Sequence, residues 1–242
     1  MKGSAYVGGE LDLFAAALNW KRYWSGLLRP MLRGCVLEVG AGLGANAPFL
    51  LGDRVHSLLS LEPDPSLAAR LKVKRDESRD PRWKVLCGTL AATRAAAAFD
   101  AVLYLDVLEH IADDAGELHE AARRLCPGGV LAVLAPAHQW LFSPFDAAVG
   151  HHRRYTRSTL AAVVPRGLMP VSLGYLDSAG VALSLANRLL LRRALPTAGN
   201  IAFWDARVVP LAARVDPLAG RLFGRSVLGV WRWGTLSGDH VR

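Results

Sequence analysis

Side chains suited to proton transfer gather in two segments of the chain. His110 ends the run Asp106-Val107-Leu108-Glu109-His110, and His151 and Tyr155 belong to Gly150-His151-His152-Arg153-Arg154-Tyr155. An imidazole has a pKa near neutrality, so either histidine can take a proton from a hydroxyl at physiological pH. His110, His151 and Tyr155 are therefore our candidate catalytic residues.

Each of these segments also has a purely structural interpretation. His110 can hydrogen-bond a neighbouring loop, and Asp146 can cap the turn that follows Ser143. Arg153 and Arg154 can pair with acids on the protein surface, or with a carboxylate or phosphate of a substrate. We favour the second role for one of the two arginines, because so many polar side chains in one loop indicate a binding site. We expect His151 and Tyr155 to face the substrate.

A glycine-rich turn follows the first strand-like segment. In Val36-Leu37-Glu38-Val39-Gly40-Ala41-Gly42-Leu43-Gly44 an apolar run leads into the turn, and a helix is predicted after it. Glycines permit positive φ and let a ligand approach the backbone, while the helix start offers free N–H groups to an anion. Gly40-x-Gly42-x-x-Ala45 also fits the nicotinamide pattern. Alone, the turn does not choose between cofactors.

An acidic residue ends the next strand-like segment, about 20 residues later. This is Glu62, which Pro63 follows. A carboxylate at this position can accept hydrogen bonds from both hydroxyls of a ribose. Together, the turn and Glu62 predict a site for an adenosine-containing cofactor.

The elements that must position these residues alternate between strands and helices, which favours a parallel sheet covered on both faces. The predicted strands are Cys35–Val39, Ser57–Leu61, Trp83–Leu86, Ala101–Leu105, Val130–Leu134 and, near the end of the chain, Val227–Trp233. The predicted helices are Leu11–Leu28, Ala45–Leu51, Pro65–Leu71, Asp113–Leu125 and one near Ser178–Arg193, and Ala135–Thr156 is expected to be a long functional loop.

The order of these motifs resembles the class I S-adenosylmethionine-dependent methyltransferases of the small-molecule and ubiquinone-biosynthesis type. The resemblance covers about Val36–Ala135 and includes the glycine turn, Glu62, Asp106-x-Leu108-Glu109-His110 and Leu125-Cys126-Pro127-Gly128-Gly129. It implies a doubly wound, mostly parallel, seven-stranded α/β sheet (Rossmann-like) with an N-terminal helix and a C-terminal helical extension. We expect one domain over 1–242, with a helical lid at 1–33, a cofactor-binding core at 34–136 and an acceptor-side region at 137–242.

The resemblance also assigns the residues that bind S-adenosylmethionine. Gly40, Ala41, Gly42 and Gly44 would wrap the methionine portion, with Glu38 supporting the turn or contacting the ammonium; Glu62 and Pro63 would hold the ribose, Thr89 and Leu90 the adenine, and Asp106 and Val107 the methionyl end. Glu109 could bind a divalent metal, as in some quinone-precursor relatives, but we predict no metal. The family's frequent acidic residue after the third strand is replaced by Gly88-Thr89-Leu90.

Composition limits the partners. The net charge is +8, and nine arginines oppose three aspartates from Ala186 onward. A basic, apolar end of this kind suits nucleic acid, anionic lipid headgroups or an acidic substrate, unless it is only a solvated surface. Three cysteines in apolar segments indicate buried free thiols in a reducing compartment. With no signal-like start and no long apolar run, we expect a cytoplasmic protein that contacts the membrane, if at all, only peripherally.

The sequence therefore predicts an enzyme that transfers a methyl group to a hydroxyl or carboxylate oxygen of a small, lipid-like or anionic molecule. RNA methylation is one alternative, but the chain has neither an added RNA-binding module nor the Asn/Asp-Pro-Pro-aromatic motif of enzymes that methylate base amino groups. A non-catalytic protein that binds adenosylmethionine is a second, and an oxidoreductase is a third. We expect a monomer or homodimer and no nucleic-acid partner.

Overall fold

The computed structural model describes residues 10–93, 98–186 and 197–234. Seven strands form one sheet in the order β3-β2-β1-β4-β5-β7-β6. They are β1 Gly34–Val39, β2 Val55–Glu62, β3 Trp83–Cys87, β4 Phe99–Leu105, β5 Leu125–Pro136, β6 Leu168–Leu176 and β7 Ser226–Trp233. Neighbours from β3 to β5 pair in parallel, and β7 runs antiparallel to both β5 and β6. The predicted mostly parallel α/β fold is confirmed.

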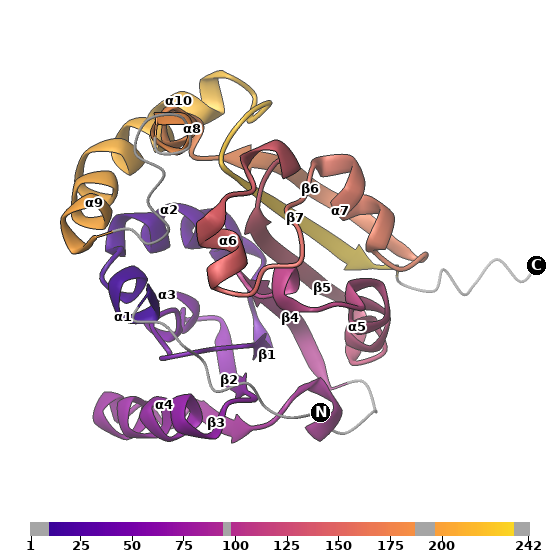
Figure 1. Ribbon diagram of the computed structural model, residues 1–242. Coiled ribbons are helices and arrows are strands. Elements are labelled where there is room, and N and C mark those ends of the chain that lie inside the picture. Colours follow the sequence, from indigo (N-terminus) through magenta and orange to yellow (C-terminus); the bar gives the residue numbers. More distant parts are fainter. Residues whose placement is uncertain (1–9, 94–97, 187–196, 235–242) are drawn as a thin grey trace, which may run out of the picture.

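Helices cover both faces of the sheet (Figure 1). They are α1 Glu10–Ala15, α2 Leu18–Leu28, α3 Ala47–Leu50, α4 Pro65–Ser78, α5 Asp114–Ala122, α6 Pro144–Ala148, α7 Arg157–Val163, α8 Ser178–Ala186, α9 Ala198–Phe203 and α10 Val209–Leu218, with a π-helical turn Trp204–Val208 between the last two. Two apolar cores lie between the layers. One core packs α2 and α10 against one face of the sheet. The other, which we call the core of the α5 face, packs α5 and α7 against the opposite face of the sheet.

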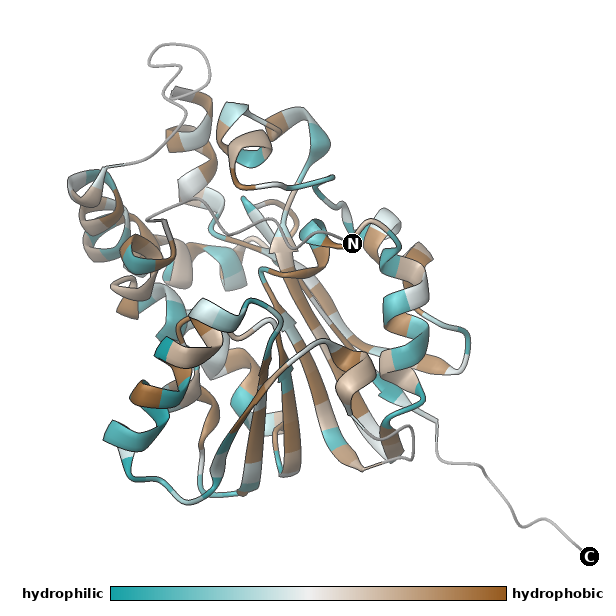
Figure 2. Cartoon of the chain, turned by 60° about the horizontal axis from the view of Figure 1, so that its bottom comes forward, coloured by the Kyte–Doolittle hydropathy of each residue, from teal (hydrophilic) through white to brown (hydrophobic). Residues whose placement is uncertain are grey.

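The central strands are apolar because both of their faces are covered (Figure 2). In β4 the segment Ala101–Leu105 is buried throughout, and its alternate side chains enter the two cores. Side-chain caps set where the flanking helices begin. Asp64 accepts the N–H groups of Ser66 and Leu67 at the start of α4, and Asp113 accepts that of Gly116 in α5.

The predicted helix Leu11–Leu28 is wrong in one respect, because the chain breaks at Ala16 and Ala17 into α1 and α2. The break has a tertiary cause. The backbone N–H groups of Asn19 and Trp20 donate to the carboxylate of Asp205 at 3.1 and 2.8 Å. A distant side chain therefore caps α2, which lets α1 turn away from the helix axis.

Other boundaries also differ from expectation. The helix predicted at Ala45–Leu51 is reduced to α3, the loop Ala135–Thr156 contains α6, and the elements α7 and β6 were not predicted. The helix near Ser178–Arg193 is described to Ala186, and the rest lies outside the described residues. The cysteines are free, as expected, but none is buried, because Cys87 is exposed and Cys35 and Cys126 are half-buried.

In the described ranges, no helix is both long and apolar enough to cross a bilayer. The division of the chain into a lid, a cofactor-binding core and an acceptor-side region stays a prediction.

Candidate functional site

A cavity of about 530 Å³ opens at the carboxyl ends of the central strands. Gly40 follows β1, Asp106 follows β4 and Pro136 ends β5, and all three line it. Ligands of open α/β sheets bind at this edge, and the volume is in the range of small-molecule sites. Much of the wall is aromatic, formed by Phe14, Trp20, Trp24, Phe145, Phe203 and Trp204.

The glycine turn forms one wall of this cavity. Gly40, Gly42 and Gly44 have φ values of 69°, 53° and 69°, in the left-handed region that favours glycine. A Cβ atom on Gly40 would lie 2.7 Å from both Cγ atoms of Val107, so the close approach of the two loops requires glycine. Gly40, Ala41 and Gly42 line the cavity, whereas Gly44 faces the side chains of Leu71 and Trp83. The first three positions therefore offer backbone to a ligand.

Two buried acids brace the turn from behind. Glu38 accepts hydrogen bonds from Asn46 Nδ2 at 3.0 Å and Ser60 Oγ at 2.9 Å, and burial raises the pKa of its carboxyl to about 7. Glu62 accepts the N–H groups of Gly42 at 2.8 Å and Asp64 at 2.9 Å, and burial raises its pKa. Of the two roles predicted for Glu38, the contacts favour support of the turn, through Asn46.

Several residues predicted to bind the cofactor lie away from the cavity. Of the residues described, Glu62, Pro63, Thr89 and Leu90 are not part of its wall, and Leu90 is buried in the core of the α5 face. Each oxygen of Glu62 accepts one backbone hydrogen bond, so each keeps a lone pair for a ribose hydroxyl.

Asp106 lines the cavity directly after β4, beside Val107. Its backbone is left-handed, with φ of 56°, and its N–H donates to Leu134 at 2.8 Å. This conformation is unfavourable for a residue with a side chain, and such strain concentrates at functional sites. Its side chain is exposed in the open cavity, and the surrounding protein still hinders hydration of the carboxylate enough to raise its pKa to about 6.

Lys21 is a cavity residue that sequence analysis missed. It lies on the buried face of α2 and is 5% exposed, and its Nζ donates to the carbonyl of Phe14 at 2.5 Å. Burial lowers its pKa to about 8, against the attraction of Asp106 and Asp205. The sequence does hold a signal for this residue. Lys21 lies at helical spacing from Trp24 and Leu28, so a charged side chain interrupts the apolar stripe of the helix.

His151 and Asp146 form a hydrogen-bonded pair at the cavity. His151 Nδ1 lies 2.8 Å from Asp146 Oδ1. Arg154 forms a bidentate ion pair with the same carboxylate, in which Nε donates to Oδ1 at 2.8 Å and Nη2 donates to Oδ2 at 2.9 Å. Asp146 has no solvent exposure. Burial acts to raise its pKa, but the hydrogen bonds with His151 and Arg154 hold the pKa well below the usual range. This carboxylate therefore stays ionised and fixes the imidazole, whose Nε2 lies 3.8 Å from Glu109 Oε1.

Glu109 and His110 complete what we call the His–carboxylate cluster, defined as Glu109, His110 and His151. Burial raises the pKa of Glu109 well above its usual range, and burial together with nearby His151 lowers that of His110 to about 4. His110 is therefore neutral near pH 7, and burial favours the protonated form of Glu109. One ligand atom from each member lies within 4.8 Å of the others, which is close enough for a shared metal ion.

The predicted role of Tyr155 is wrong. Its hydroxyl donates to Asp114 Oδ2 at 2.7 Å, its side chain is 2% exposed, and it is not among the described residues that line the cavity. An isolated bridge between Ala137 and Tyr155 holds this loop segment beside the end of β5, and the ring packs in the core of the α5 face. His110 and His151 do line the cavity.

The arginines that were expected to pair with a substrate have partners within the protein. Arg153 contacts Asp114 Oδ2 at 2.6 Å, and Arg154 contacts Asp146. Both arginines therefore pair with acids of the protein, as the structural interpretation predicted. The two acids are buried rather than on the surface.

Comparison with known proteins identifies the core of this fold. Residues 37–133 match the family model described as a methyltransferase domain. Over 110 residues the chain is 34% identical to a probable S-adenosylmethionine-dependent methyltransferase of Mycolicibacterium smegmatis. The match covers 45% of this chain and 40% of that relative.

The central part of the chain is therefore similar to a methyltransferase domain. Solved structures agree on its fold. Phosphoethanolamine N-methyltransferase 2 of Haemonchus contortus, in complex with S-adenosyl-L-methionine, superposes with a TM-score of 0.63 at 15% identity, over 92% of this chain and 56% of that one. The cyclase SpnF superposes with a TM-score of 0.60 at 18% identity, over 89% and 82%. A cyclase on this fold means that the reaction must be argued from the site.

Proposed function

We propose that the protein is an S-adenosylmethionine-dependent methyltransferase that methylates a hydroxyl or carboxylate oxygen of a small, lipid-like or anionic molecule. The observation that carries this proposal is one cavity with the glycine turn on one wall and the oriented His151 on another. The family match supports the cofactor, and the His151–Asp146 pair supports an acceptor that must lose a proton.

The walls of the cavity fit the amino-acid end of this cofactor. Lys21 and Asp106 bring opposite charges to the wall beside Gly40 and Gly42. We assign the cofactor carboxylate to Lys21, and the ammonium to Asp106 and the backbone of the turn. On this proposal Glu62 and Pro63 hold the ribose beyond the cavity wall, and Thr89 and the backbone of Leu90 contact the adenine.

The bound cofactor supplies an electrophilic methyl group, and the protein aligns the acceptor and removes its proton. The ionised Asp146 accepts the hydrogen on Nδ1 of His151, so Nε2 keeps its lone pair toward the cavity. With a hydroxyl acceptor, the new carbon–oxygen bond would form as the methyl carbon–sulfur bond breaks and S-adenosylhomocysteine leaves, and the acceptor proton would move to this Nε2. Asp146 then stabilises the imidazolium, as a positioning residue.

The neighbours of His151 favour the same arrangement. His110 does not readily gain a charge, so it adds no cation beside His151, and the charge of Arg154 is balanced by the ionised Asp146 that both groups contact. His110 packs edge-on against His151, with ring centroids 4.6 Å apart. We therefore assign proton removal to His151 and contact with the acceptor to His110.

The aromatic walls favour an acceptor with an apolar portion, and nucleic acid is not the partner on this proposal. We place the protein in the cytoplasm, as a monomer or homodimer that contacts the membrane peripherally. The chain covers about 40% of the length of the curated relative that it matches.

Thermal stabilisation by S-adenosylmethionine, S-adenosylhomocysteine and NADH, measured in parallel, tests the cofactor. A ligand that binds only the folded state raises the melting temperature with its concentration. We expect the first two to stabilise the protein, and stabilisation by NADH alone would contradict the proposal.

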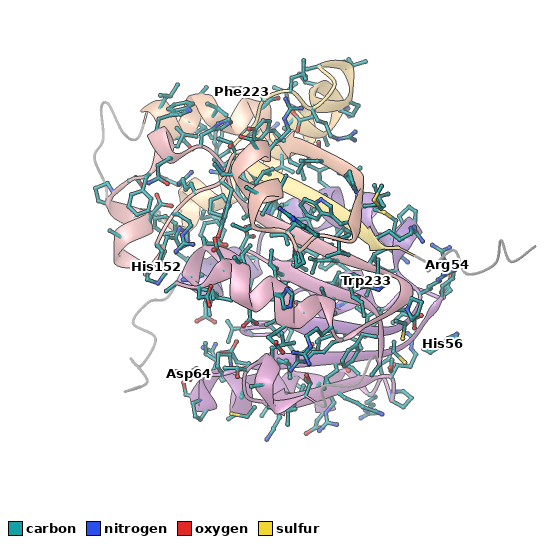
Figure 3. The ribbon with its side chains drawn as sticks, turned by 90° about the vertical axis from the view of Figure 1, so that its right-hand side faces the viewer. Arg54, His56, Asp64, His152, Phe223 and Trp233 are labelled. Atoms are coloured by element: carbon teal, nitrogen blue, oxygen red, sulfur yellow. The ribbon has the colours of Figure 1, made fainter. Side chains whose placement is uncertain are left out.

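Incubation with methyl-labelled cofactor and separated lipid, RNA and soluble fractions tests the reaction. His151→Ala should abolish labelling while stabilisation by adenosylhomocysteine remains. His152→Ala is the matched control, because His152 is exposed at the surface next to the site (Figure 3). Equal labelling by both variants would remove His151 from the mechanism, and label in the RNA fraction would replace the small acceptor.

A further inference from the structure

The outer side of the C-terminal helices carries large apolar side chains in water. Six of the eleven exposed large hydrophobic side chains in the described residues fall between positions 203 and 223. We call them the C-terminal apolar face: Phe203, Leu211, Val215, Leu218, Leu222 and Phe223, which are 39–88% exposed. They lie on α9, on α10 and on the turn that follows, in the helical layer at one end of the molecule (Figure 1).

The acids of this segment point inward. Asp205 caps α2, and Asp216, which has no solvent exposure, accepts hydrogen bonds from the hydroxyl of Tyr23 at 2.8 Å and the N–H of Asp177 at 2.7 Å. Arg207 and Arg214 point outward and are exposed. Between positions 201 and 223, the exposed side chains are thus apolar or arginine, with no acid and no other polar group.

A surface that combines exposed apolar side chains with exposed arginines matches the boundary between headgroups and acyl chains in an anionic bilayer. Exposed leucine and phenylalanine are costly in water and gain by entering the acyl region. Arginine side chains at the edge of such a surface extend to the phosphates and bind them with charge-assisted hydrogen bonds. The acids, which anionic lipid would repel, are withdrawn into the protein.

The face is continuous with the cavity. Phe203 is 56% exposed and also lines the cavity, together with Ile201 and Trp204 of the same helical segment. A lipid that enters beside Phe203 would therefore meet the apolar side chains of Ile201 and Trp204 in the cavity wall.

We propose that the C-terminal apolar face docks on the surface of an anionic phospholipid bilayer and takes the methyl acceptor from that bilayer. The second half of this proposal rests on the proposed methyl transfer, whereas the docking does not. Contact is peripheral, because α10 spans only ten residues.

Co-sedimentation of the full chain with vesicles tests the docking. We expect binding to vesicles of phosphatidylglycerol and phosphatidylcholine, little binding to pure phosphatidylcholine, and loss of binding at high salt. The variant Leu218→Glu/Leu222→Glu should bind at least tenfold more weakly. The variant Arg207→Gln/Arg214→Gln should lose about fivefold per arginine at low salt.

Val73→Glu/Met169→Glu is the matched control, because these side chains are 58% and 64% exposed on other parts of the surface. It should bind as the wild type does, and all variants should keep their stabilisation by adenosylhomocysteine. Equal loss in the control, equal binding to neutral vesicles, or a dimer in solution that the Leu218→Glu/Leu222→Glu change dissociates would overturn the docking.

The acceptor is tested separately, with methyl-labelled cofactor and total lipid presented in vesicles. Label in the lipid fraction, reduced in proportion to vesicle binding in Leu218→Glu/Leu222→Glu, is the expected result. Label confined to soluble metabolites would overturn the lipid acceptor and leave the methyl transfer standing. No label in any fraction would count against the proposed function, and the vesicle result would stand by itself.

Discussion

Replacement of Lys21 by methionine should stabilise the ligand-free protein and weaken its hold on the cofactor. Lys21 is 5% exposed, and burial lowers its pKa from 10.5 to about 8. At 1.36 kcal/mol per pKa unit, the charged form costs about 3 kcal/mol. At pH 7 the lysine carries this charge, so Lys21→Met should stabilise the protein by up to about 3 kcal/mol.

The sign of the pH dependence follows from the same shift. Between pH 8 and pH 10.5 the unfolded chain holds the lysine proton and the folded protein does not, so stability rises with pH in this window. The advantage of Lys21→Met is therefore complete below about pH 8 and fades as the pH approaches 10.5. Thermal melts at pH 7 and above measure it, and in a protein of this size about 3 kcal/mol corresponds to about 6 to 12 °C.

Cofactor affinity should change in the opposite direction. A hydrogen bond to a charged group contributes about 1.5–3 kcal/mol, so loss of the contact with the cofactor carboxylate should weaken binding of S-adenosylhomocysteine by about 10- to 150-fold. Calorimetric titration measures this loss. The ratio of wild-type affinity to variant affinity should fall as the pH rises through about 8, because Lys21 then loses its proton. Titration of the ligand itself affects both proteins equally and cancels in this ratio.

Lys72→Met is the control, because Lys72 is exposed on α4. Its affinity and melting temperature should match those of the wild type. If Lys21→Met folds and binds S-adenosylhomocysteine as tightly as the wild type, the assignment of the carboxylate to Lys21 is refuted. A melting temperature below that of the wild type would refute the argument from the buried charge.

Four further outcomes are expected. Asp146→Asn should lower turnover of methyl-labelled cofactor by about 10²- to 10⁴-fold, because the imidazolium of His151 loses its partner; unchanged turnover would contradict the pairing. Gly40→Ala should weaken adenosylhomocysteine binding at least tenfold, since its Cβ would lie 2.7 Å from Val107, and Val107→Ala in the same chain should restore part of it in the same titration. Tyr155→Phe should lose about 1.5–3 kcal/mol in urea unfolding and keep its turnover, because its hydroxyl only bonds a buried acid. A metal chelator should leave turnover unchanged, and a loss that Mg²⁺ restores would assign the His–carboxylate cluster to a metal.

Strand β6 shows why part of the fold could not be predicted. Its sequence contains Pro170 and Gly174, which weaken a strand assignment. Pro170 is tolerated because β6 lies at the edge of the sheet, and its register with β7 shifts between Pro170 and Ser172. Only the pairing with a strand some 50 residues away makes this segment a strand.

The predicted site residues divide in the same way. His110 and His151 line the cavity, whereas Tyr155 and Arg153 bond to Asp114 at the start of α5. All four come from motifs that look alike in sequence, since each is a polar residue near a strand end. Their partners come from other elements, so spacing along the chain did not distinguish them.

What the amino-acid sequence determined by itself is local. The positive φ values of Gly40 and Gly42 and the apolar strands before them depend on neighbouring residues, so the glycine turn and the parallel sheet were readable without coordinates. The tertiary structure alone decided which charges face the cavity. Lys21 meets Asp106, and Asp205 caps α2, across more than 80 residues of chain. Burial and pairing depend on everything that packs around a group, and that is set only when the whole chain has folded.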